Sequence, residues 1–175
     1  MAFLLKNQAA NRFQATQAVV SQWIKVSRAA KSLPQSTTQQ LFRVYGGRVL
    51  VQALIGEVTT VIEGTDPVLK VSTSALTDAS ALQGTAYDIA STLDLSSDEV
   101  GTMYAVEGDG TALVSGNQVS GTVELTNREW VMKQGQIYIT TGASKTGAIK
   151  WDLWYQPLDP GAYVVAIDVA TAAIT

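Results

Sequence analysis

The amino-acid sequence predicts an all-β protein: a jelly-roll-like β-sandwich preceded by an extended or partly helical N-terminal arm. Three observations favour this class, namely many short β-rich runs, glycines that separate them, and a single segment with helical spacing. A chain of 175 residues is long enough to bury one sizeable core. We therefore expect a basic arm and connector over residues 1–40 and a β-sandwich domain over residues 41–175.

The arm contains the segment with helical spacing. Val19, Trp23, Val26 and Ala30 recur every three or four residues within 8–31, which predicts a short amphipathic helix. Serines in the same stretch are weak helix formers, so the alternative is an extended arm that becomes ordered on a partner. Pro34 then ends this segment and begins a polar connector.

The strands are expected to begin after the connector. A Gly-Gly pair at 46–47 separates two β-rich runs, 41–45 and 48–55, and this pattern predicts a tight hairpin. Gly56 marks a candidate β-bulge in the strand that follows. Further strands are expected at 57–62, 69–73, 85–95, 102–106, 119–125, 130–132, 136–141, 147–155 and 162–167.

The run 147–155 gives the clearest two-residue alternation. Its large apolar residues occupy every second position, and Trp154 falls between them on the opposite face. The inward set is Ile149, Trp151, Leu153 and Tyr155. An outward tryptophan is expected to be covered, either by the arm or a loop of its own subunit or by a neighbouring subunit.

The composition argues against an enzyme. The sequence has no Cys and no His, which removes the usual zinc and copper ligands, the cysteine nucleophile and the commonest general base. Glycines at 142 and 147 lack the lysine and hydroxyl residue of a phosphate loop. We expect no catalytic residue, no cofactor and no metal.

Acidic residues offer the main alternative to that expectation. Asp88, Asp94, Glu107 and Glu124 could supply a carboxylate pair for glycan hydrolysis. Asp98, Glu99 and Asp109 extend the acidic stretch, whose spacing matches no EF-hand loop. We expect these residues to be solvated loop charges, and a virion-associated glycan-binding or hydrolytic protein is the least favoured function.

Charge is unevenly distributed along the chain. Seven of the 12 basic residues precede Glu57, the first acidic residue. The rest of the chain, from Glu57 onward, contains the remaining 5 basic residues and all 15 acidic ones. A basic arm on an acidic body suits docking to an acidic neighbour, or else the arm folds back on its own body. The basic residues are too thinly spread to predict nucleic-acid binding, and no apolar stretch approaches the roughly 20 residues of a membrane span. The expected interface residues are Arg12, Phe13, Trp23, Lys25, Arg28, Lys31 and Trp154.

Several segments resemble a family of phage structural proteins. They are LPQSTT at 33–38, LFRVYGGRVLV at 41–51, LIGEVTT at 54–60, DIASTLDL at 88–95, GTMY at 101–104 and GAIKWDLWYQPLDPGA at 147–162. The resemblance covers roughly residues 33–170 and implies a virion component. Within that class, the size and β-rich body are similar to those of capsid decoration, or cement, proteins.

This resemblance implies a structural virion protein that binds and stabilises the major capsid shell. Its partners would be the major capsid protein and further copies of itself in a homotrimer, with no nucleic acid and no membrane. Its place would be the outer surface of a bacteriophage head, after assembly in the host cytoplasm. A tail, baseplate or fibre component is the alternative.

Overall fold

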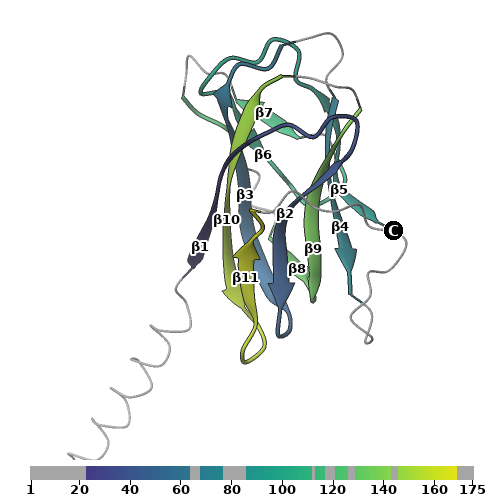
Figure 1. Ribbon diagram of the computed structural model, residues 1–175. Coiled ribbons are helices and arrows are strands. Elements are labelled where there is room, and N and C mark those ends of the chain that lie inside the picture. The colour runs from purple at the N-terminus through teal and green to yellow at the C-terminus, as the bar shows by residue number, and fades with distance from the viewer. Residues whose placement is uncertain are drawn as a thin grey trace, which may run out of the picture.

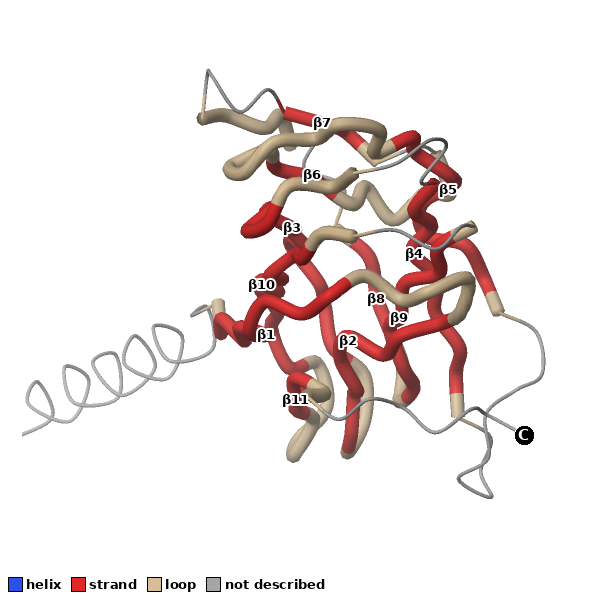
Figure 2. Tube along the Cα trace, turned by 45° about the horizontal axis from the view of Figure 1, so that its top comes forward, coloured by secondary structure: helices blue, strands red, loops and turns tan. Residues whose placement is uncertain are grey.

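The computed structural model describes residues 23–63, 68–76, 86–111, 113–116, 121–125, 129–142 and 146–168. These residues form two antiparallel sheets that pack face to face, and they contain strands and loops but no helix (Figures 1 and 2). The predicted all-β sandwich is confirmed. Within this part of the chain, no helix meets the length and hydropathy needed to cross a membrane.

The first sheet, sheet A, follows the order β1-β10-β3-β6-β7, and β8 also pairs with β3. Its strands are β1 (Ile24–Ser32), β3 (Val49–Thr60), β6 (Met103–Ala105), β7 (Val114–Gly116), β8 (Trp130–Met132) and β10 (Ala148–Pro157). Sheet B follows the order β11-β2-β9-β4-β5. Its strands are β2 (Thr38–Tyr45), β4 (Val68–Ala75), β5 (Tyr87–Asp94), β9 (Gly135–Thr141) and β11 (Tyr163–Ala166).

Strands from opposite ends of the chain are neighbours in both sheets. β1 pairs with β10, β2 pairs with β9, and β4 pairs with β5, so the pairs are nested in the sequence. All of these pairs are antiparallel. The chain therefore doubles back on itself along its length, and neither sheet is complete until the last strands have formed.

The alternation predicted for β10 is confirmed. Ile149, Trp151, Leu153 and Tyr155 are at most 3% exposed and face the core, while the residues between them are half-buried on the outer face. Residues from both sheets complete this core, among them Phe42, Leu54, Leu69 and Ile137, which are fully buried. Burying such side chains provides most of the favourable free energy of folding.

Gly56 is required by the indole ring of Trp151, which lies across from it in β10. A Cβ atom added at Gly56 would come within 2.9 Å of two ring atoms of this fully buried tryptophan. The register of β3 and β10 shifts near Gln52 and Thr59 and not at Gly56. The candidate bulge at Gly56 is therefore wrong, and the glycine instead makes room for a large core side chain.

The tight hairpin predicted at 46–47 is also wrong. β2 and β3 are both strands, but they belong to opposite sheets, so the glycine pair connects sheet B to sheet A. Gly46 has a φ of 72°, and a Cβ atom there would lie 2.1 Å from the carbonyl oxygen of Gly161. A hairpin is excluded because β2 already pairs with β11 and β9 along its two edges, and β3 pairs with β10 along one edge and with β6 and β8 along the other.

The helix predicted over 8–31 is wrong for its last residues, and 1–22 lie outside the described residues. Residues 24–32 form β1, an edge strand that pairs with β10 from Ile24 opposite Tyr155 to Ser32 opposite Ala148. Val26 packs against the core from this strand. Backbone hydrogen bonds offered by β10 thus outweigh the weak helical preference of this stretch.

We predict that Gly56→Val lowers the free energy of unfolding by about 2–3 kcal/mol, because the added methyl groups collide with the Trp151 ring. Urea unfolding monitored by tryptophan fluorescence measures the change. Thr60→Val, at an exposed position of the same strand, is the matched control and should change stability by less than about 0.5 kcal/mol. Equal losses in the two variants would contradict this packing.

Candidate docking surface

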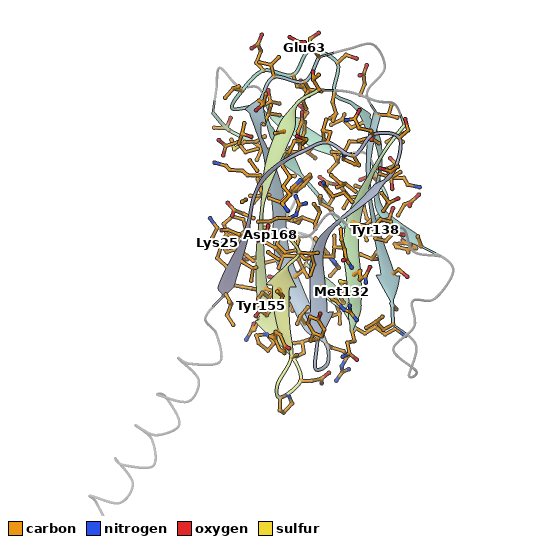
Figure 3. The ribbon with its side chains drawn as sticks, viewed as in Figure 1. Lys25, Glu63, Met132, Tyr138, Tyr155 and Asp168 are labelled. Carbon is orange, nitrogen blue, oxygen red and sulfur yellow. The ribbon has the colours of Figure 1, made fainter. Side chains whose placement is uncertain are left out.

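Lys25 of β1 lies directly opposite Trp154 of β10, and both side chains lie on the outer face of sheet A (Lys25 is labelled in Figure 3). The Lys25 Nζ lies 5.0 Å from the centroid of the Trp154 ring and 2.9 Å from Asp152 Oδ2. A cation over an indole face is favourable. The outward Trp154 is thus contacted by the arm of its own subunit, which is one of the two alternatives the sequence left open.

Arg28 lies between the two sheets, although the sequence places it among the interface residues. It is 1% exposed, and its Nε donates a hydrogen bond to the carbonyl oxygen of Ile167 at 2.9 Å. Burial lowers the pKa of Arg28, while the nearby charge of Asp168 opposes that shift. Arg28 therefore joins β1 to the segment after β11 and cannot reach a partner from this conformation.

The remaining predicted interface residues lie near the same edge or outside the described part. Lys31 Nζ is 4.0 Å from Asp168 Oδ1, and Trp23 is half-buried just before β1. Arg12 and Phe13 lie outside the described residues. Over 24–32 the arm thus folds back on its own body, and its cations face acceptors of the same chain.

A different exposed surface combines aromatic, aliphatic and cationic side chains. We define the aromatic patch as Arg43, Tyr45, Tyr163 and Val165, which lie on the outer face of β2 and β11 in sheet B. The rings of Tyr45 and Tyr163 stack with centroids 5.3 Å apart, and the Arg43 guanidinium lies 4.8 Å from the Tyr45 ring centroid. Tyr163 is 49% exposed and Val165 is 38% exposed.

This composition is typical of binding surfaces. Tyrosine and arginine are enriched at the energetic centres of protein interfaces, where a rigid ring buries much area at little cost in conformational entropy. Sequence reasoning missed the patch, although Arg43 and Tyr45 alternate with the buried Phe42 and Val44. The sequence signal is that the outward-facing side chains of the two strands are aromatic, aliphatic and cationic. These side chains form one patch only because β2 pairs with β11.

A clamp between two turns holds the patch in place. Asp159 accepts hydrogen bonds from the backbone N–H of Arg48 at 2.7 Å and from its guanidinium at 2.9 and 2.8 Å. The backbone N–H of Leu158 also donates to the Arg48 carbonyl oxygen. Tyr45 and Tyr163 lie just beyond these turns, so the clamp fixes the spacing of their strands. The hydrogen bonds from Arg48 lower the pKa of Asp159 to about 2.

The candidate catalytic carboxylates hold local structure in the described residues. Asp88 accepts a hydrogen bond from Ser72 at 2.8 Å and lies 3.1 Å from Lys70 Nζ. Burial pushes the pKa of Asp88 up, but these contacts outweigh burial and leave the pKa below its ordinary value. Asp98 accepts a hydrogen bond from the buried Tyr104 hydroxyl, and Asp109 caps its own loop through Thr111. No cluster of three potential metal ligands occurs within the described ranges.

Comparisons with known proteins give limited information. Neither models of known protein families nor curated protein sequences match this chain. A solved structure of infectious bursal disease virus, Gx strain, is similar at 10% identity and a TM-score of 0.26, covering 81% of this chain and 33% of that one. The Gt strain structure gives 8% identity, a TM-score of 0.29, and 82% and 33% coverage. The chain spans about a third of those proteins, and at these scores the likeness carries no conclusion about function.

We predict that Asp159→Asn destabilises the fold at pH 7 and that its difference from the unmutated protein vanishes in acid. Because the pKa of Asp159 is lower in the folded state, its contribution is complete above the unfolded value of about 3.9 and is lost as the pH falls through about 2. Urea unfolding between pH 7 and pH 2 measures this convergence. Glu63→Gln, an exposed carboxylate at the opposite end of the sandwich (Figure 3), is the control, and a constant Asp159→Asn deficit across this range would contradict the clamp.

Proposed function

We propose that this protein is a non-catalytic structural component of a virus particle, and specifically a decoration, or cement, protein on the outer surface of a bacteriophage head. Its partner would be the major capsid protein. The aromatic patch is the observation that carries the proposal, because it offers Tyr163 and Val165 to solvent beside a stacked Arg43–Tyr45 pair. The sequence resemblance to phage structural proteins supports the class of partner.

The electrostatics of the body support docking through this patch. Four cations elsewhere in the described sandwich form ion pairs with carboxylates of the same chain, namely Lys25–Asp152, Arg48–Asp159, Lys70–Asp88 and Lys150–Glu57. Such surface pairs contribute little to affinity for a partner. The aromatic rings are therefore the better source of binding energy, and neither nucleic acid nor a membrane is part of the proposal.

We also propose that the sandwich is a jelly roll, and that copies assemble as homotrimers before or during docking in the host cytoplasm. The nested pairing of β1 with β10, β2 with β9 and β4 with β5 supports the jelly roll. Viral capsid domains are among the proteins that use this architecture. The trimer is suggested by similarity to cement proteins, and β11, the edge strand of sheet B, lies beside the patch.

We predict that Tyr163→Ser weakens binding to phage heads that lack this protein by about 30-fold, the effect of losing an interface contact of about 2 kcal/mol. Co-sedimentation of purified protein with such heads measures the affinity. Tyr87→Ser is the matched control, since Tyr87 is 62% exposed on the β5 edge of the same sheet, away from the patch.

Two results would contradict the proposal. If both variants bound heads as well as the unmutated protein, the aromatic patch would not be the docking surface. If the unmutated protein bound isolated tails and not heads, it would be a tail, baseplate or fibre component instead.

A further inference from the structure

The inner side of β1 contains a charged side chain next to an aromatic one. Arg28 is 1% exposed and lies directly opposite Trp151 of β10, which is fully buried. Directly opposite residues of an antiparallel pair point to the same side of the sheet, with Cβ atoms roughly 4.5–5.5 Å apart. The guanidinium and the indole ring are therefore neighbours on the inner side of sheet A, at the edge where β1 approaches β11.

Three nitrogen atoms of this pair have hydrogens to donate but no acceptor. Arg28 uses its Nε for the bond to the Ile167 carbonyl oxygen. Its Nη1 and Nη2 are buried and have no hydrogen-bond partner in the described part of the chain, and the same holds for Trp151 Nε1. Buried polar groups are normally paired, and leaving a charged one unpaired is especially costly.

The orientation of the indole ring turns its Nε1 toward Arg28. A Cβ atom added at Gly56 of β3 would lie closest to Cη2, Cζ3 and Cε3 of Trp151, so this edge of the ring lies against β3. Nε1 belongs to the opposite edge of the indole. Because β10 lies between β3 and β1 in sheet A, the Nε1 edge is on the side of β1, where Arg28 lies.

The positive charge of Arg28 is not matched by a carboxylate in contact with it. Among the described residues, no ion pair involves Arg28. The charge of Asp168 acts on Arg28 from a distance, but its side chain is 64% exposed and lies 4.0 Å from Lys31 Nζ (Asp168 is labelled in Figure 3). A buried guanidinium without an ion pair favours an anion as its partner.

We propose that Arg28 and Trp151 bind a small monovalent anion, such as chloride, between the two sheets at the β1–β11 edge. Arg28 Nη1 and Nη2 and Trp151 Nε1 donate hydrogen bonds to this ion, and its charge neutralises the guanidinium. All three donor atoms are buried, so a monatomic ion fits better than phosphate or sulfate. β1 is an edge strand, and local opening of this strand admits the ion.

Two other partners fit these donors less well. A water molecule would bring two further O–H donors to a group of atoms that are all donors, and it would leave the charge of Arg28 uncompensated. The Asp168 carboxylate would have to leave the surface and its contact with Lys31.

Urea unfolding of the full chain, followed by circular dichroism, tests the proposal. Chloride is varied by mixing sodium chloride with sodium gluconate at one ionic strength, so that general screening stays equal. An ion that binds only the folded state lowers the equilibrium constant of unfolding in proportion to its concentration once the site is mostly occupied. We expect this constant to fall about tenfold for each tenfold rise in chloride above the dissociation constant. An equilibrium constant that does not change with chloride would overturn the proposal.

Three variants locate the effect. Arg28→Met keeps a long apolar side chain and should abolish the chloride dependence, while Trp151→Phe keeps a core ring without Nε1 and should weaken it. Lys150→Met is the matched control, because it also removes one positive charge but from the outer face of sheet A, where Lys150 pairs with Glu57. It should retain the full dependence. A dependence that persists unchanged in Arg28→Met would overturn the proposal.

A direct measurement needs no variant. Anomalous X-ray diffraction from crystals of the unmutated protein grown in bromide should show a bromide ion in contact with the Nη atoms of Arg28 and with Trp151 Nε1. A water molecule at this place without an anomalous peak, or an Asp168 carboxylate turned onto Arg28, would overturn the proposal. The head-binding function does not depend on either result.

Discussion

The pairing of β1 with β10 is the interaction on which the rest of the structure depends. It places β10 inside sheet A, between β1 and β3, so that Trp151 is covered on both sides and can pack against Gly56. The same ladder puts Lys25 over Trp154 and directs Arg28 toward the core. Because β1 comes from the start of the described chain and β10 from near its end, the sandwich closes only when distant parts of the sequence meet.

This pairing also decides which side chains remain available to a partner. Three cations of β1 contact acceptors of their own chain: Lys25 contacts Asp152, Arg28 the carbonyl oxygen of Ile167, and Lys31 Asp168. Residues 24–32 therefore bind mainly to the body of the same subunit. Among the exposed large apolar side chains, Tyr163 and Val165 share β11 and lie beside the Arg43–Tyr45 pair of β2. Binding through such a patch depends more on rigid turns beside it than on charge. The Arg48–Asp159 clamp makes these turns rigid.

The sequence predicted the features that depend on local pattern. Alternation in 147–155 located β10 and the faces of its side chains, and most strands lie where β-rich runs were expected. It could not predict strand partners: the Gly46–Gly47 pair permits a turn, but β2 pairs with β11 and β9 while β3 pairs with β10, β6 and β8, so the two strands belong to different sheets. The helical spacing of Val26 and Ala30 did not produce a helix, because residues 24–32 pair with β10 as a strand. The three-residue β7 was missed, and 121–125, expected to be strand, is a loop. The aromatic patch combines residues about 120 positions apart, which no local pattern reveals.

Cryo-electron microscopy of the parent particle tests the central claim most directly, because it shows both the location of the protein and the face that it turns toward its partner. The account predicts density for the sandwich repeated over the icosahedral shell, with Tyr163 and Val165 against the major capsid protein. Density confined to the tail or to a single vertex, or a shell-bound sandwich whose aromatic patch faces solvent, would contradict it.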